Sequence, residues 1–146
     1  MDLPRDKDSF GIIHCDMHPD NFYIDGDKIN VFDFGDSKKG WFALDIGIAL
    51  FDAVWWGRKN AAGNDFTNAI IENFLKGYLS ANYLSDFWIS KIPMFMKYRQ
   101  LSMKPEENGL GCNREEWVYH IENDILFTGF ELKAVSNIIN KVKINL

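Results

Sequence analysis

Two short β-rich runs separated by an Asp-Gly pair constrain the fold of this chain more than any other feature. The runs are residues 22–24 and 29–32, and residues 25–28 (Asp-Gly-Asp-Lys) lie between them. This pattern is typical of a β-hairpin, because Asp-Gly suits a tight turn between two strands. Antiparallel pairing brings strand ends side by side, so we expect Asn21 and Asp33, which flank the hairpin, to be spatial neighbours.

Polar residues around this hairpin have a spacing that indicates phosphoryl-transfer chemistry. His14, Asp16 and Asn21 follow the pattern H-x-D-x-x-x-x-N, and Asp33 opens the sequence D-F-G. Kinases carry both patterns, in this order, in the catalytic loop and the metal-binding segment. A carboxylate such as Asp16 can take the proton of an acceptor hydroxyl. The oxygens of Asn21 and Asp33 are ligands that Mg²⁺ prefers.

Two simpler interpretations of the same residues stay open at this point. The acidic and amide residues between positions 16 and 21 are types that often only shape a tight turn. His14, Cys15 and His18 contain nitrogen and sulfur atoms of the kind that bind zinc. The presence of both patterns in order, joined by a hairpin, favours the magnesium interpretation.

The remaining chain predicts a mainly helical scaffold. Residues 46–56 are apolar on nearly every face, and Asp45 is placed to cap a buried helix there. Helical spacing continues over residues 66–78 and 85–103, the second helix being broken at Pro93.

Later segments complete this scaffold. A capping pattern at Asn113 opens a further helix, and a final one runs from Glu131 to Val142. Loops are expected at residues 38–40, 57–65 and 105–113. A length of 146 residues fits a single domain, residues 1–146.

Charge and cysteine content exclude several classes of protein. The net charge of -5 and the pI near 5.1 argue against a nucleic-acid partner, which calls for a basic face. The longest apolar run is interrupted by Asp52, so no membrane span is expected. Cys15 and Cys112 fit no disulfide framework, and the N-terminus has no signal-peptide character. We therefore expect a cytoplasmic protein.

Three segments, residues 14–21, 31–34 and 40–46, resemble the aminoglycoside phosphotransferase family. That family includes choline kinase-like and homoserine kinase-like enzymes, and its fold is protein-kinase-like. The similarity is tight over residues 11–56 and diffuse over the helical remainder. It implies a mainly α fold with a small β-hairpin, the C-terminal lobe of the kinase-like fold.

Within that lobe, the resemblance implies a division of roles. Residues 10–35 would hold the catalytic loop, hairpin and metal-binding segment, and residues 45–146 a helical subdomain. Asp16 would be the catalytic base, while Asn21 and Asp33 would bind Mg²⁺ and, through it, ATP. His14 and Asp45 would support the catalytic loop. His18 would either support it as well or lie near the substrate.

Two positions depart from the family pattern. Cys15 stands where relatives usually have glycine, so its side chain would crowd the loop or demand a backbone conformation that glycine tolerates better. Gly35 stands where an acidic residue is frequent. Neither change removes a ligand.

The resemblance also shows which parts of a kinase are not in this sequence. The catalytic loop begins at residue 14, which leaves no room for the N-terminal lobe with its phosphate-binding lysine and adenine hinge. The chain is then a piece of a longer protein, a truncated product or a separate subunit. Whether it is itself an enzyme stays open, and the alternative is a non-catalytic binding or assembly module.

The implied substrate is a small molecule with a hydroxyl group, of aminoglycoside, choline or homoserine type. The loops at 57–65 and 105–113 would select it. Acidic residues in the helical part, Glu106, Glu107, Glu122 and Asp124, would suit an amine-bearing molecule. The apolar surface that a missing lobe would cover leaves two protein partners open, a separate N-terminal lobe or a second copy of the chain.

Overall fold

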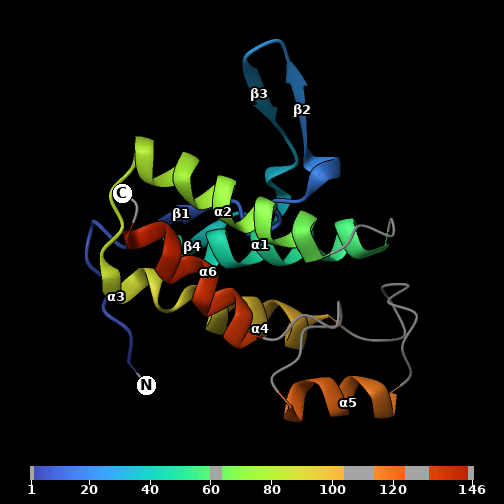
Figure 1. The fold of residues 1–146 in the computed structure, drawn as a ribbon. Helices are drawn as coiled ribbons and strands as arrows, with labels where there is room; N and C mark the ends of the chain where they lie inside the picture. Colours follow the sequence, from blue (N-terminus) through green and yellow to red (C-terminus); the bar gives the residue numbers. More distant parts are fainter. Residues whose placement is uncertain (1, 60–63, 104–113, 124–131, 145–146) are drawn as a thin grey trace.

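The computed structural model of the protein describes residues 2–59, 64–103, 114–123 and 132–144 (Figure 1). The strands are β1 (Phe10–Ile13), β2 (Phe22–Asp25), β3 (Lys28–Val31) and β4 (Lys38–Trp41). Two 3₁₀ turns, η1 (Pro19–Asn21) and η2 (Phe34–Asp36), flank the second and third strands. The helices are α1 (Phe42–Lys59), α2 (Asn64–Ala81), α3 (Asp86–Ile89), α4 (Ile92–Ser102), α5 (Arg114–Glu122) and α6 (Leu132–Ile144).

Strands β2 and β3 form the hairpin that the sequence predicts. They pair antiparallel from Phe22↔Val31 to Asp25↔Lys28. Gly26 in the turn has φ +58°, a left-handed conformation that costs glycine little because it has no Cβ. The hairpin projects away from the helices, so its base lies against the body of the molecule and its tip does not (Figure 1).

A second strand pair replaces the loop expected at residues 38–40. Strand β4 pairs antiparallel with β1, from Phe10↔Trp41 to Ile13↔Lys38. The loop prediction was wrong because Lys-Lys-Gly carries no local β preference, while the partner strand supplies the hydrogen bonds. A Cβ on Gly40 would lie 2.4 Å from Ile13 Cδ1, so a side chain there would require the end of the Ile13 side chain to move.

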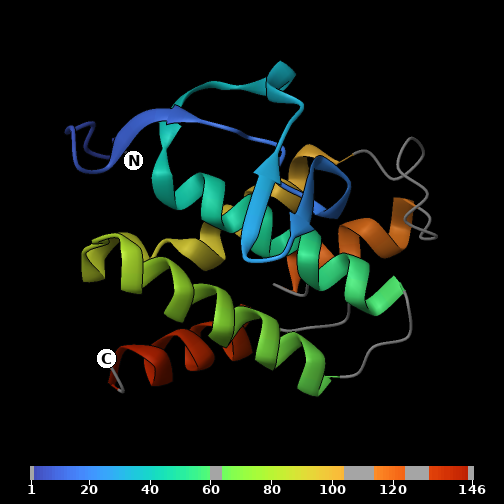
Figure 2. The same ribbon diagram turned by 90° about the horizontal axis from the view of Figure 1, so that it is seen from above.

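Helix α1 is the centre of the core, as its apolar sequence predicts. Leu50, Phe51 and Val54 have no exposed surface. Helices α2 and α4 pack against α1, and α6 packs on both α2 and α4 (Figures 1 and 2). The helix begins at Phe42, however, so the prediction that Asp45 is its N-cap was wrong.

The contact between α1 and α4 is unusually close. A Cβ on Gly47 of α1 would lie 2.6 Å from Cβ of Phe95 on α4, a separation that two side chains cannot share. The missing side chain lets the two helices approach, and it sets the distance at which their other residues face each other.

The predicted break at Pro93 is confirmed. Helix α3 ends at Ile89 and α4 begins at Ile92, which places Pro93 in the first turn, where its missing N–H costs no helical bond. The expected loop at 57–65 is shorter than predicted, since α1 continues to Lys59 and α2 begins at Asn64.

Other predicted features fall partly or wholly outside the described residues. The loop at 105–113, the capping residue Asn113 and the helix start at Glu131 all lie there. In the part of the chain that is described, no helix is both long and apolar enough to cross a membrane.

Candidate active site

The backbone of the loop after β1 is held by the side chain of Asp45. Asp45 Oδ2 accepts the N–H of His14 at 3.0 Å, and Oδ1 accepts the N–H of Cys15 at 2.8 Å. Asp45 lies in the first turn of α1, thirty positions further along the sequence. Its carboxylate therefore fixes the loop to the buried helix instead of capping that helix.

Cys15 has the strained conformation that its position suggested. Its φ is +69°, in the left-handed region that favours glycine, and the side chain is buried. The thiol lies close to Lys38 of β4, and this contact raises the pKa of the Lys38 ammonium despite the opposing effect of burial.

His14 ties the loop to the end of strand β3. Its Nε2 lies 2.9 Å from the carbonyl oxygen of Phe32, and its Nδ1 accepts the N–H of Asp16 at 3.4 Å. These contacts require the neutral ring with its hydrogen on Nε2. The ring also packs against Phe34 at 4.8 Å between centroids. Both nitrogens are therefore used by the protein, which argues against zinc; among the described residues no group of three His, Cys, Asp or Glu could hold a metal.

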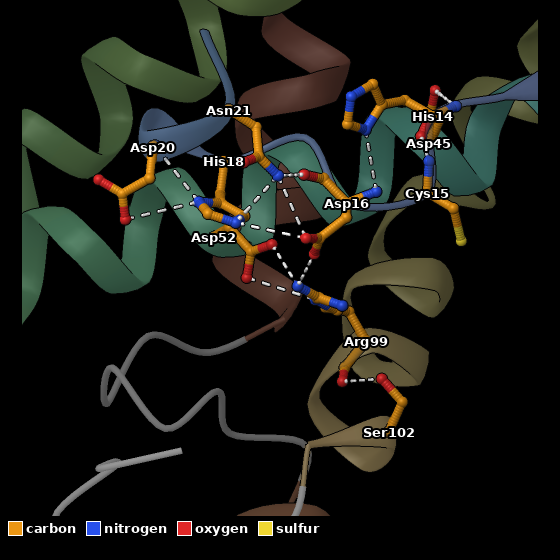
Figure 3. Close-up of polar contacts among 10 residues, drawn as sticks. All are labelled: His14, Cys15, Asp16, His18, Asp20, Asn21, Asp45, Asp52, Arg99 and Ser102. Atoms are coloured by element: carbon orange, nitrogen blue, oxygen red, sulfur yellow. Dashed lines mark hydrogen bonds and ion pairs between the residues drawn. The ribbon is translucent and has the colours of Figure 1, made fainter. Parts of the chain in front are cut away.

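Asp16 and Asn21 are in direct contact. Asn21 is buried, and its Nδ2 donates to the backbone oxygen of Asp16 at 2.8 Å and to Oδ2 at 3.2 Å. His18 lies beside them: its Nδ1 accepts the N–H of Asp20 at 3.3 Å, and Asn21 Nδ2 lies 3.1 Å from its Nε2. That nitrogen lies 3.3 Å from Asp16 Oδ2, so Asn21 and His18 both hold this oxygen (Figure 3).

Asp33 lies at the other end of the hairpin from Asn21. Past the last paired residues, the N–H of Phe32 donates to the backbone oxygen of Asn21 at 3.1 Å, so the backbone of Asp33 follows directly after a residue bonded to Asn21. Asp33 has φ 59° and ψ 64°. Within the described residues, no hydrogen bond joins its carboxylate to Asn21 or to Asp16. The backbone neighbourhood that the hairpin predicts is present, without a hydrogen bond between the two side chains among the described residues.

Two residues of the site were not found from the sequence as functional candidates. Arg99 of α4 donates through Nη2 to Asp16 Oδ1 at 2.8 Å and to Asp52 Oδ2 at 2.9 Å. Asp52 is the carboxylate within the apolar sequence of α1, and a charged residue in a buried helix is a signal that could have been used. Arg99 carries no such signal, because nothing in its own sequence neighbourhood distinguishes it.

The electrostatics of this pair follow from its burial. Asp52 is 3% exposed, and burial raises the pKa of its carboxyl, with the Arg99 guanidinium acting in the opposite direction. Burial alone would lower the pKa of Arg99, yet the charges and hydrogen bonds of Asp52 and Asp16 outweigh it and raise that pKa. The guanidinium is thus charged at neutral pH, as arginine is in proteins generally.

A pocket of about 290 Å³ opens beside Asp16. It is lined by Asp16, His18, Asp20, Asp52, Trp55, Trp56, Arg99 and Met103. The acidic lining thus comes from the candidate catalytic loop and α1. Of the acidic residues suggested by the sequence, Glu122 is exposed on α5 and Glu106, Glu107 and Asp124 lie outside the described residues.

A larger apolar pocket, of about 780 Å³, lies between the hairpin and helices α1 and α2. Its lining includes Ile29 and Val31 of β3, Ala49 of α1 and Phe74 of α2. Asp16, Asn21 and Asp33 do not line it. Of these three residues, Asp16 lines the smaller pocket, so we associate that pocket with the candidate chemistry.

A helical body with a projecting hairpin, and an aspartate–asparagine pair at the base of that hairpin, is the arrangement of a kinase-like phosphotransferase fold. The chain belongs to the phosphotransferase enzyme family, APH, whose model matches residues 2–86. The expected resemblance and fold class are therefore confirmed.

Individual relatives in this family are small-molecule kinases. The chain is 33% identical over 147 residues to amicoumacin kinase of Bacillus subtilis (strain 168), covering 91% of this chain and 43% of that protein. It is also 33% identical over 88 residues to homoserine kinase of Rhizobium johnstonii, covering 60% of this chain and 26% of that protein.

A solved structure agrees with these similarities. An amicoumacin kinase, hAmiN, in complex with AMP-PNP, Ca²⁺ and Ami, superposes with a TM-score of 0.70 and 27% sequence identity. The match covers 91% of this chain and 43% of hAmiN. The chain thus spans less than half the length of these relatives.

Proposed function

We propose that this chain supplies the catalytic residues of an ATP- and Mg²⁺-dependent phosphotransferase acting on a hydroxyl of a small molecule. The observation that carries the proposal is the contact between Asp16 and Asn21 at one end of a hairpin whose other end is Asp33. Family membership supports the reaction class, and the complex of hAmiN with AMP-PNP and Ca²⁺ supports a nucleotide with a divalent cation.

The residues at the hairpin base suit a magnesium ion. Asn21 uses its amide nitrogen for Asp16, and no hydrogen bond to its amide oxygen occurs in the described part of the chain. The carboxylate of Asp33 is likewise unengaged there, and a Cβ on Gly35 would lie 3.3 Å from its Oδ1. Two hard oxygen donors beside a position without a side chain fit Mg²⁺ better than zinc. Bound Mg²⁺ would neutralise the negative charge on the phosphates of ATP.

In this scheme Asp16 accepts the proton of the attacking hydroxyl. Its carboxylate borders the pocket of about 290 Å³, where an acceptor molecule can lie against it. Asn21 and His18 hold Oδ2, which fixes the carboxylate toward that pocket. His14 and Asp45 hold the loop backbone in place by hydrogen bonds to the end of β3 and from the first turn of α1.

The pocket lining favours an acceptor that carries an amine. Asp16, Asp20 and Asp52 face it together with one arginine, so the lining has an excess of negative charge. Trp55 and Trp56 add aromatic surface that can contact an ammonium group. Amicoumacin and homoserine, for which the relatives are named, are the molecules to titrate first.

The rest of the nucleotide site would come from protein outside this sequence. The chain covers 43% of its amicoumacin kinase relative, and we propose a separate N-terminal lobe or a second copy of the chain as the partner. We also propose a reducing cytoplasmic setting, in which the buried Cys15 remains a free thiol.

Calorimetric titration of MgATP tests the metal site. We expect the wild-type chain to bind and the Asp33→Ala variant to lose that binding, because one of two ligand oxygens is removed. Asp27→Ala is the matched control, since it removes the same charge from the exposed hairpin turn. Absence of heat in all three proteins would refute a working metal site in this chain and favour a non-catalytic binding module.

A further inference from the structure

The guanidinium of Arg99 joins helix α4, helix α1 and the candidate catalytic loop. Its Nη2 lies 2.8 Å from Asp16 Oδ1 and 2.9 Å from Asp52 Oδ2, and its Nε donates to Asp52 Oδ1 at 3.4 Å. Arg99 therefore contacts both carboxylate oxygens of Asp52, but only Oδ1 of the Asp16 carboxylate. Arg99 is anchored on α1 and presents its Nη2 to the loop (Figure 3).

We propose that Arg99, anchored by Asp52, is a positioning residue that fixes the orientation of the Asp16 carboxylate. The inference rests on the proposed function, in which Asp16 accepts the proton of the substrate hydroxyl. It adds to that function a link between the catalytic loop and a helix of the distant C-terminal part.

The carboxylate of Asp16 is held on both sides. Asn21 and His18, from its own loop, contact Oδ2 at 3.2 Å and 3.3 Å. Arg99 contacts Oδ1, from α4. Among the described residues, no other hydrogen bond to Oδ1 occurs, so without Arg99 the carboxylate plane could turn about the Cβ–Cγ bond. Orientation of this kind matters, because a misplacement of about 1 Å can slow an enzyme by about a hundredfold.

Stability alone does not account for the pair. Asp52 is 3% exposed and the Arg99 side chain 20%, and removing such charges from water costs about as much as their attraction returns. An apolar pair at the same positions would join α1 to α4 equally well. Such a pair could not donate a hydrogen bond to Asp16, and that is the property that distinguishes a positioning role.

The side-chain amide of Asn21 is a reporter for the orientation of Asp16, because its Nδ2 donates to Asp16 Oδ2. We suggest Arg99→Met, which keeps most of the side-chain length and removes every donor. Once the Asp16 carboxylate can turn, its Oδ2 should no longer hold the hydrogen bond from Asn21 Nδ2. In ¹⁵N NMR spectra, the Asn21 side-chain amide resonances should therefore move, and their hydrogens should exchange with water about tenfold faster, as expected for the loss of a hydrogen bond to a charged group. Arg5→Met, the same change beside Phe10 and Trp41, should leave them unchanged.

A second variant keeps the test decisive if Arg99→Met fails to fold. Arg99→Lys retains the charge, but its ammonium lies one atom short of the position of Nη2 and it has no counterpart to Nε. Lysine therefore cannot keep the Asp52 anchor and also reach Asp16 Oδ1, so exchange at Asn21 should still accelerate. Unchanged Asn21 resonances in a folded Arg99 variant would overturn the inference. A purely structural role would lower the thermal stability without moving them.

The test is independent of the proposed function. The Asn21 reporter needs neither nucleotide nor turnover, whereas the proposed function is judged by MgATP binding to the wild-type chain. Wild-type binding with unchanged Asn21 signals would reject the positioning role alone. Absent binding with accelerated exchange would reject the catalytic proposal alone.

Discussion

Cys15 and Asp33 are the described non-glycine residues with positive φ, at +69° and +59°, and they lie at the two ends of the candidate catalytic segment. Aspartate tolerates the left-handed region because its short polar side chain can bond locally, whereas cysteine has no such compensation. Strained backbone is often found where a protein must aim a functional group. Here the two residues border Asp16 and the hairpin base.

The strain at Cys15 can be measured by comparing two substitutions. Cys15→Ala keeps the Cβ and therefore the strain, while Cys15→Gly releases it, and both remove the thiol. After allowing for the greater freedom of glycine in the unfolded chain, we expect the Gly variant to be more stable than the Ala variant by about 0.5–1 kcal/mol in urea unfolding.

Gly26 is a matched control for that comparison. Its φ is +58° and a Cβ there would meet nothing within 4 Å, so Gly26→Ala introduces strain without a clash. We expect Gly26→Ala to lose a similar amount. A loss at Gly26 together with equal stability of the two Cys15 variants would show that the loop relaxes around position 15.

At this scale the sequence predicted the residues with a local pattern and missed those without one. Asp16, Asn21 and Asp33 could be chosen from their spacing, and the hairpin placed two of them near each other. Arg99 could not, because its role depends on how closely two helices pack, which no short segment encodes. Asp52 is intermediate: its burial was implied, but its partner was not.

Among the elements, helix α1 both forms the apolar core and carries charged residues of the candidate site. It is the most buried helix in the described chain, yet it carries the carboxylates of Asp45 and Asp52 to the site. Its core-facing apolar residues could be predicted from sequence, whereas its start could not, because Phe42 and Ala43 give no capping signal. Strand β4 was missed for a related reason, since its pairing partner lies about thirty residues away.

The burial of Asp52 makes the free energy of unfolding of the protein depend on pH. Burial raises the pKa of Asp52 above its ordinary value of 3.8, so the folded protein binds that proton more tightly than the unfolded chain. The resulting stabilisation is fully present below pH 3.8 and is lost as the pH rises through the raised pKa. The free energy of unfolding of the wild type, relative to Asp52→Asn, should therefore fall as the pH rises above 3.8.

Urea denaturation of both proteins at several pH values between about 3.5 and 7 measures this difference. Asp27→Asn, which makes the same change in the exposed turn, is the matched control. A wild-type advantage over Asp52→Asn that grows with pH would show that the attraction of Arg99 outweighs burial.

For the molecule as a whole, the hairpin and strand β1 leave large apolar side chains exposed to water. Ile24 and Ile29 of the hairpin are each 67% exposed, and Ile12 of β1 is 70% exposed. Ile29 also lines the pocket of about 780 Å³ between the hairpin and the helices. Exposed apolar surface of this kind is typical of a contact with another protein.

We therefore expect the isolated chain to self-associate through the hairpin. The double variant Ile24→Thr and Ile29→Thr should raise the dissociation constant at least about tenfold, because each buried isoleucine contributes about 1.5–3 kcal/mol. Leu101→Thr, on α4 away from the hairpin, is the control and should associate like the wild type. Sedimentation velocity over a range of concentrations measures this; a wild-type chain that remains monomeric throughout would contradict the expectation.

The close approach at Gly47 has a consequence for motion. Because the backbone of α1 lies against Phe95 without an intervening side chain, α1 and α4 cannot slide past each other without a collision, and they should move as one rigid body. In the described part of the chain, opening of the site to admit a ligand would then come from the hairpin and the η2 turn. The end of the site that bears Asp33 would move, while Asp52 on α1 and Arg99 on α4 would stay in place.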